Sequence, residues 1–213
     1  MTTFHPRRDD AGRLVRIERP STPTPAAAWR DPSAVVVVVP GGDVPRALHR
    51  VRMASWRPTS PDGAWEVAAA AQPFTEPAFE PPASLAPAAG AVLVEPDGRI
   101  WLAQPSNAFG GVAHVVPKGR LDSGATLAAT ALREVWEELG LLAELTGHLF
   151  DVARSVTFTR YYVGRRVAGS PADMGPESQG AVLAPPARLA ELLNGSHDAA
   201  LVEAIVGRLG GAY

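Results

Sequence analysis

The chain has 213 residues, including 20 glycines and 21 prolines but no cysteine, and a formal net charge of −2. This length predicts one ordinary domain, or one domain with a small appendage, and the missing cysteines exclude disulfides, thiolate catalysis and cysteine-based zinc sites. The five-valine run at residues 35–39 is too short to span a bilayer, and the N-terminus lacks the apolar core of a secretory signal. We therefore expect a soluble cytoplasmic protein that contacts no membrane. The near-neutral charge also argues against a stable nucleic-acid complex.

Most of the prolines precede residue 90, so the first part of the chain is expected to be rich in loops. Its predicted elements are short strands at 14–18, 34–39 and 64–69 and a helix at 44–53, with Asp43 as N-cap. Residues 72–87 hold five prolines and no periodic pattern, which is typical of an extended linker. We therefore divide the chain into an N-terminal accessory region with a Pro-rich linker, 1–87, and a main domain, 88–213.

The main domain alternates strand and helix patterns. A hairpin is predicted from strands 90–95 and 99–104 around Pro96-Asp97-Gly98, followed by a short strand at 112–116. Thr126 and Gly140 are the expected caps of a helix that ends near Leu139. The remaining predictions are an antiparallel pair at 145–154 and 156–166, a loop at 169–180, and helices at 188–193 and 197–209, the last capped by Ser196. This order predicts an α+β fold with a mixed sheet.

Three carboxylates gather on one face of the helix that follows Thr126. Residues three and four positions apart share a helix face, so Glu134, Glu137 and Glu138 converge, while an apolar stripe on the other side anchors the helix. Hard divalent cations, Mg²⁺ in particular, prefer such oxygen ligands. A solvated acidic surface is the alternative interpretation of this face taken alone.

The helix belongs to a longer pattern with fixed spacing. The matching positions are Gly119, Arg133, Glu134, Val135, Glu137, Glu138, Gly140 and Leu141. Together they resemble the Nudix box, the signature of the Nudix hydrolase family, with one departure: Ala125 stands where the family has its first glutamate. The resemblance covers about residues 88–209 and implies an α/β/α sandwich with a mixed sheet, preceded here by the small Pro-rich region.

The resemblance also implies an activity and a metal site. Family members cut a P–O–P bond in a nucleoside diphosphate linked to another moiety, using Mg²⁺ or Mn²⁺. Glu137 and Glu138 would be the main metal ligands, with the carbonyl of Lys118 as a further ligand. Glu134 would be another ligand or would orient the attacking water.

Other positions receive roles in the same way. Arg133 would brace the box through an ion pair, and Gly119 and Gly140 would be structural. Lys118, the only lysine of the chain, and Arg120 would contact substrate phosphates.

The resemblance also implies a general base or an additional metal ligand outside the box, on a later loop. By sequence order the candidate is Glu177, with Asp173 as its competitor. Either residue could equally be an exposed loop residue with no role in catalysis.

The resemblance leaves the substrate open. Pro117-Lys118-Gly119 resembles the start of the box in branches that act on dinucleoside polyphosphates and in those that act on diphosphoinositol polyphosphates, and the nearby Tyr161 and Tyr162 favour the former. We therefore expect a dinucleoside polyphosphate or related nucleotide, with ADP-ribose, a nucleotide sugar or a diphosphoinositol phosphate as alternatives. Ala125 keeps open a different class, a non-catalytic nucleotide-binding module.

Several remaining features receive structural interpretations. Trp101, Phe109 and Tyr162 could stack a base but are expected in the core, and His114 and His148 are expected to be packed. Strand 34–39 is too apolar to stay exposed, so it should be buried against the main domain or in a homodimer.

Overall fold

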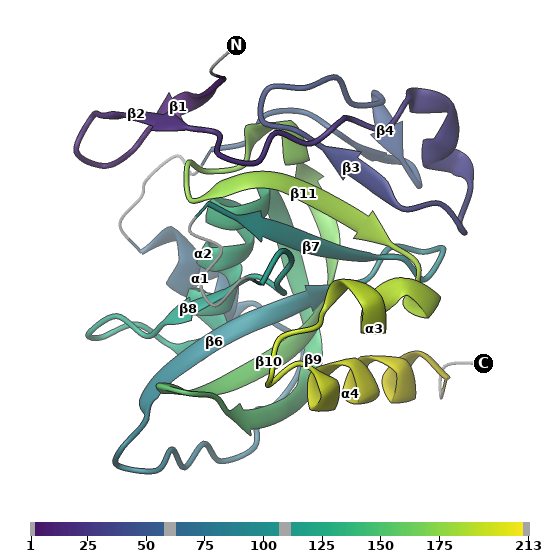
Figure 1. Ribbon diagram of the computed structural model, residues 1–213. Coiled ribbons are helices and arrows are strands. Elements are labelled where there is room, and N and C mark those ends of the chain that lie inside the picture. The colour runs from purple at the N-terminus through teal and green to yellow at the C-terminus, as the bar shows by residue number, and fades with distance from the viewer. Residues whose placement is uncertain (1–2, 58–62, 107–111, 211–213) are drawn as a thin grey trace.

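The computed structural model describes residues 3–57, 63–106 and 112–210 (Figure 1). Among these residues the strands form one sheet in the order β8-β6-β10-β9 and a second in the order β3-β11-β7, together with the small hairpins β1-β2 and β4-β5. The strands are β1 (Phe4–Arg8), β2 (Leu14–Arg16), β3 (Val36–Val38), β4 (Ala47–Leu48), β5 (Val51–Arg52), β6 (Ala86–Leu93), β7 (Ile100–Pro105), β8 (Lys118–Arg120), β9 (Leu141–Ala153), β10 (Thr157–Gly169) and β11 (Ser178–Ala184). The α-helices are α1 (Ala64–Ala70), α2 (Leu127–Leu139), α3 (Leu189–Leu192) and α4 (Ala199–Gly210), and short 3₁₀ turns occur at Ala26–Arg30, Pro171–Asp173 and Pro186–Arg188.

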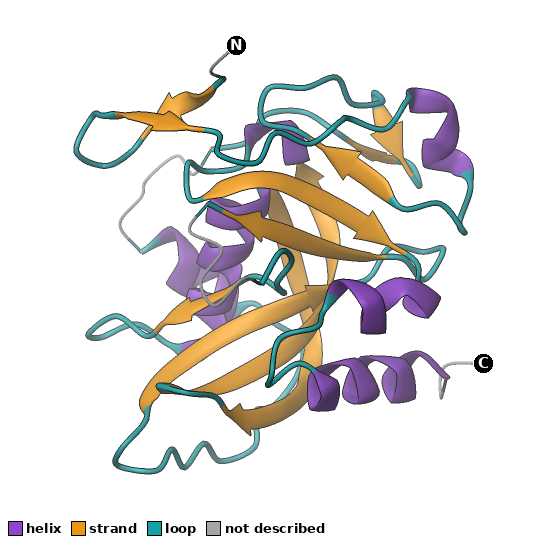
Figure 2. Ribbon diagram, in the orientation of Figure 1, coloured by secondary structure: helices purple, strands orange, loops and turns teal. Residues whose placement is uncertain are grey.

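Both faces of the central strands are buried, because helices cover the sheets from two sides (Figure 2). On β7, Trp101 and Ala103 pack in the core that contains α2, while Ile100 and Leu102 pack in the core that contains α3 and α4. This alternation follows from the two-residue period of a strand. The expected α+β fold, an α/β/α sandwich with a mixed sheet, is therefore confirmed. In the mixed sheet β10 runs parallel to β6 and antiparallel to β9.

The expected pair 145–154 and 156–166 is confirmed, although both strands are longer than predicted.

The hairpin at 90–104 is confirmed only at its tip. Gly98 has the positive φ of 82° that the turn requires, and the Glu95 amide donates to the Arg99 carbonyl. Beyond the Val94–Ile100 bridge the strands separate, β6 into one sheet and β7 into the other.

Two predicted elements of the N-terminal region are wrong. Residues 44–53 form the β4-β5 hairpin instead of a helix, with positive φ angles at His49 and Arg50. This conformation is unfavourable for such residues, and long-range contacts to the hairpin offset its cost. Residues 64–69 form helix α1 instead of a strand, because alanine is a strong helix former and Trp65 packs on α2.

Other boundaries also differ from the predictions. Residues 112–116 form only the Ala103–Val115 bridge instead of a strand. Strand β8 has no counterpart among the predicted elements, and β11 begins inside the predicted loop 169–180. The C-terminal helices are confirmed as α3 and α4, but α4 begins after Asp198, so Ser196 is not its cap.

The N-terminal region contributes a strand to the three-stranded sheet β3-β11-β7. The predicted buried strand 34–39 is confirmed as β3, which pairs with β11 through Val36–Val38. The predicted linker also packs on the domain, since the Arg160 guanidinium donates to the carbonyls of Pro77 and Ala78. Region and domain therefore share a sheet and a core.

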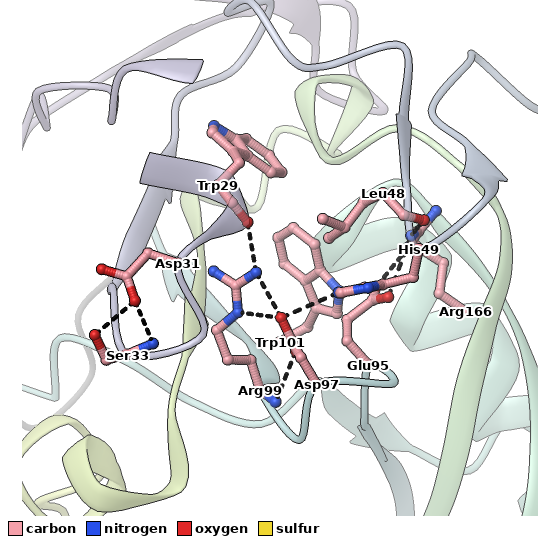
Figure 3. A network of polar contacts seen from close by, with 10 residues as sticks. All are labelled: Trp29, Asp31, Ser33, Leu48, His49, Glu95, Asp97, Arg99, Trp101 and Arg166. Carbon is pink, nitrogen blue, oxygen red and sulfur yellow. Dashed lines mark hydrogen bonds and ion pairs between the residues drawn. The ribbon is translucent and has the colours of Figure 1, made fainter. Parts of the chain in front are cut away.

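A buried polar network reinforces this junction (Figure 3). The Arg166 guanidinium binds both oxygens of Glu95 at 2.6 and 3.2 Å and donates to the Leu48 carbonyl at 3.0 Å. Trp101 donates its indole N–H to the same carboxylate, and Arg99 donates to the Trp29 carbonyl at 2.6 Å. Charged groups of the sheet thus hold the backbone of the N-terminal region.

Candidate active site

Helix α2 is fixed at both ends by local chemistry. The Thr126 hydroxyl accepts from the Ala129 amide at 3.2 Å, as expected of an N-cap. Gly140 ends the helix with φ 67°, and a Cβ at this position would clash with the Ser170 carbonyl. The predicted caps are both confirmed.

A carboxylate from the N-terminal region also reaches this helix start. Glu66 on α1 accepts from the amide of Thr126 at 3.0 Å and from its hydroxyl at 2.9 Å. Negative charge at a helix N-terminus is favourable. Glu66 therefore supplies an acidic group next to Ala125, the position where the box lacks its glutamate, and no local sequence signal revealed this.

Two of the box glutamates, Glu134 and Glu138, have buried carboxylates. Glu134 is buried, and a Cβ built at Gly119 would overlap its carboxylate, so only glycine fits there. The Oε2 atom of Glu138 is buried and has no hydrogen-bond partner among the described residues. A carboxylate oxygen in this state is costly unless a cation compensates it.

The electrostatics of the cluster indicate the same deficit of positive charge. Burial raises the pKa of Glu134 to about 7, with Arg133 opposing and Glu137 and Glu177 adding to the rise. Burial, reinforced by Glu134, raises the pKa of Glu138 well above its usual range. Burial also raises the pKa of Glu137, and Glu177 and Asp10 contribute to that increase. The protein's own cations therefore do not balance these acids.

Arg133 lies where a bracing residue is expected. Its guanidinium contacts Glu134 at 2.9 Å, Glu137 at 2.7 Å and Asp122 at 3.3 Å. It also lies 3.5 Å from the Arg120 carbonyl. These contacts join the box loop to the helix and leave Glu138 outside the ion-pair network of Arg133.

The cluster is suited to a divalent cation. No three acidic or histidine side chains in the described ranges are already arranged as a complete ligand set. The donor chemistry nevertheless fits Mg²⁺, because the unpaired Glu138 oxygen and the Glu134 carboxylate are hard ligands in a site short of positive charge. A backbone carbonyl and the substrate phosphates are the usual remaining ligands of this ion.

A cleft of about 1000 Å³ opens beside the cluster. Its polar and charged lining comprises Ser106, Lys118, Arg120, Glu138, Arg154, Ser155, Thr157, Glu177, Asn194, Ser196 and His197. Burial lowers the pKa of Lys118, while Glu138 opposes this shift. The lining of the cleft thus combines acidic groups, Glu138 and Glu177, with the basic groups Lys118, Arg120 and Arg154.

The structure brings Glu177 to the site and keeps Asp173 away from it. Glu177 lines the cleft and lies close enough to raise the pKa of all three box glutamates. Asp173 instead accepts from the Ser55 hydroxyl at 2.6 Å, and its carbonyl accepts from Arg7. Of the two acidic candidates, only Glu177 therefore faces the cleft.

Sequence reasoning missed the contribution of Arg154 and the loop 194–197 to the lining of the cleft. Arg154 contacts the buried Asp198 at 3.1 Å, and Asp198 in turn accepts from the Gly195 amide at 3.0 Å. These contacts hold the α3–α4 loop against the β9–β10 turn. Arg154 and Asp198 are 44 positions apart, so no local pattern could have linked them.

Of the aromatic and histidine side chains named from the sequence, Trp101, Tyr162, His114 and His148 are placed as expected. Trp101 and Tyr162 are fully buried, and Phe109 lies outside the described residues. His114 and His148 are part-buried and contact Gln104 and Asp151. None of the four described side chains lines the cleft.

Comparison with known proteins agrees with this architecture. A model of the NUDIX domain matches residues 84–203, more than half of the chain. The chain therefore belongs to the Nudix hydrolase family.

Individual relatives are more distant. The RNA pyrophosphohydrolase of Novosphingobium aromaticivorans is 36% identical over 74 residues, which covers 31% of this chain and 46% of that protein. The chain thus matches less than half the length of this curated relative. An ADP-ribose pyrophosphatase from Streptococcus suis 89-1591 superposes with a TM-score of 0.50 at 16% identity, covering 60% of this chain and 94% of that one. An Ap4A hydrolase from C. elegans gives 0.47 at 19% identity, with 58% and 98% covered. At 16% identity, the likeness to the Streptococcus suis structure shows the fold alone.

Within the described residues, no helix is both long and apolar enough to cross a membrane.

Proposed function

We propose that the protein is a divalent-metal-dependent pyrophosphohydrolase that cleaves the P–O–P bond of a nucleotide-type substrate. The observation that supports this most strongly is the buried, unpaired Oε2 of Glu138 beside Glu134, at the edge of the cleft. Glu134, Glu137, Glu138 and the Lys118 carbonyl would hold Mg²⁺ or Mn²⁺. When bound, the metal lowers the pKa of a water molecule and neutralises charge on the departing phosphate.

The chain's own residues have distinct roles in this proposal. The Glu177 carboxylate accepts the proton of the attacking water, and Glu134 orients that water if it is not itself a ligand. Lys118 and Arg120 bind the phosphates, where fixed positive charge stabilises the transition state. The position of the box loop relative to helix α2 is maintained by Arg133, Gly119 and Gly140.

The size of the cleft supports a substrate larger than a single phosphate group. Its lining includes the polar loop 194–197, and Val112, Val115 and Val156 supply apolar contact area. Such a mixture suits a nucleoside held beyond the phosphates. We favour a dinucleoside polyphosphate or related nucleotide, with ADP-ribose, nucleotide sugars and diphosphoinositol phosphates as alternatives. The substrate is a small molecule, the expected location is cytoplasmic, and a homodimer is compatible with the proposal.

The test is a Mg²⁺-dependent phosphate-release screen over dinucleoside polyphosphates, ADP-ribose, nucleotide sugars, NADH and diphosphoinositol phosphates. A short RNA that carries a phosphoanhydride bond belongs in the same screen, because the Novosphingobium relative is named an RNA pyrophosphohydrolase. Hydrolysis of at least one compound, abolished by EDTA, is expected. If Ala125 instead marks a binding module, no compound will be cut, while calorimetry will still detect nucleotide binding.

A further inference from the structure

The N-terminal arm, residues 4–21, lies outside the part of the chain that the NUDIX model matches. It includes the β1-β2 hairpin and then passes beside β11 (Figure 1). The arm contacts both ends of one short segment, residues 173–179, and Glu177 is part of that segment. Arg19 and Ser21 of the arm also contact Pro105 and Gln104 on β7. The arm is therefore well placed to determine how Glu177 is presented to the cleft.

Gln179 makes the contact at one end of the segment. Its side-chain oxygen accepts from the amides of Glu18 and Arg19, each at 3.0 Å, and its amide nitrogen donates to the Arg16 carbonyl at 3.1 Å. Gln179 is only 3% exposed and lies where the β11–β7 register shifts, between Ser178 and Gly180. A bulge of this kind redirects a side chain, here towards the arm.

Arg7 makes the contact at the other end. Its guanidinium donates to the Asp173 carbonyl at 3.2 Å and lies over the Trp136 ring, 5.5 Å from the ring centre. Ser55, also from the N-terminal region, donates to the Asp173 carboxylate. The segment is thus tied to N-terminal residues both before and after Glu177.

Between these ends the segment is fixed to the catalytic helix and to β7. The Gly175 amide donates to the Glu137 carbonyl at 2.6 Å, and the Ser106 amide donates to the Glu177 carbonyl at 2.7 Å. The Glu177 carboxylate itself makes no hydrogen bond to any residue in the described ranges, and the residue is exposed. The direction of the Glu177 side chain therefore depends on the position of its backbone.

We propose that the N-terminal arm is a positioning element of the active site, in which Gln179 binds the arm and thereby holds Glu177 towards the box glutamates. The inference rests on the proposed function, because it assigns a means of holding the proposed base. Gln179 contacts no reacting atom, so it is a positioning residue. Misplacing a reacting group by about 1 Å costs up to roughly a hundredfold in rate.

The first test measures hydrogen–deuterium exchange in the full chain without metal. Gln179→Leu keeps the side chain at similar size but removes all three bonds to the arm. We expect peptides covering residues 173–179 to exchange at least about fivefold faster than in the wild type. The matched control is Thr24→Val, which removes the bond from the Val37 amide to the Thr24 hydroxyl at another anchor of the N-terminal region. The control should leave the exchange of residues 173–179 unchanged.

The second test is a double-mutant cycle in turnover, measured on the best substrate of the screen. Gln179→Leu should lower kcat about tenfold with little change in KM, because it alters a transition-state group and no ground-state contact. In the Glu177→Gln background the same change should cost less than about twofold, since the group it positions is already disabled. Thr24→Val should leave kcat unchanged in both backgrounds.

The outcomes separate the two claims. Unchanged exchange in Gln179→Leu, or a full tenfold loss that persists in the Glu177→Gln background, would overturn the positioning role. A wild type that hydrolyses nothing would overturn the proposed function, and faster exchange in Gln179→Leu would then still support anchoring of the segment by the arm. Circular dichroism must show that every variant is folded before either measurement is interpreted.

Discussion

Replacing Arg166 with methionine tests the network that joins the N-terminal region to the sheet. The change leaves the Glu95 carboxylate, 4% exposed, without its ion pair, and the Leu48 carbonyl loses its 3.0 Å bond. Removing one partner of a buried ion pair costs about 3–5 kcal/mol. At about 4 kcal/mol, and with about 2–4 °C per kcal/mol for a domain of this size, the melting temperature should fall by about 8–16 °C.

The adjacent residue provides a matched control. Arg165 is largely exposed and pairs with Glu144 at 2.7 Å, so Arg165→Met should cost less than about 1 kcal/mol. Adding Glu95→Gln to Arg166→Met should recover part of the loss, because the unpaired charge is removed. Urea unfolding followed by far-UV circular dichroism measures all four proteins. Equal losses in the two single methionine variants would refute the assigned importance of the buried network.

Three further predictions concern other parts of the molecule. Lys118→Arg should lower turnover about tenfold if the ammonium contacts phosphate, because the guanidinium is larger and is not a point charge. If the Lys118→Arg variant instead has the same kinetics as the wild type, only the Lys118 carbonyl, as a metal ligand, has a role. Deleting residues 1–80 removes β3 and exposes β11, so the product should aggregate, and a monomeric product with an unchanged melting temperature would contradict this. Without metal, the melting temperature should fall as the pH rises from 5 to 7.5. In this range the Glu134 carboxyl is still protonated in the folded protein, where its pKa is about 7, but is already ionised in the unfolded chain. Glu134→Gln should reduce that fall, and an equal fall in both proteins would show that Glu134 is not its source.

The parts of the site that could be predicted from sequence are those governed by local geometry. Glu134, Glu137 and Glu138 share a helix face because of their spacing, and the Thr126 and Gly140 caps act within one turn. Burial of β3 followed from its composition alone.

The parts that could not be predicted depend on residues far apart in the chain. Glu66 reaches Thr126 across 60 positions, and Gln179 binds Glu18 across 161. The β4-β5 turn has positive φ angles at His49 and Arg50, and its Leu48 carbonyl accepts from Arg166, 118 positions away. Propensity favoured a helix there, and tertiary contacts overrode it.

The central claim is that the box glutamates bind the metal that supports hydrolysis. Its most direct test compares the Mg²⁺-dependent turnover of the wild type, Glu137→Gln and Glu138→Gln on the best substrate of the screen. Glu203→Gln, on the exposed face of α4, is the matched control and should behave as the wild type.

Both box variants should fold, since carboxylate repulsion in the metal-free protein is relieved. Each should nevertheless lose at least about a hundredfold in turnover. An active wild type whose Glu137→Gln and Glu138→Gln variants both keep full Mg²⁺-dependent activity would contradict the account, because the catalytic metal would then be bound elsewhere.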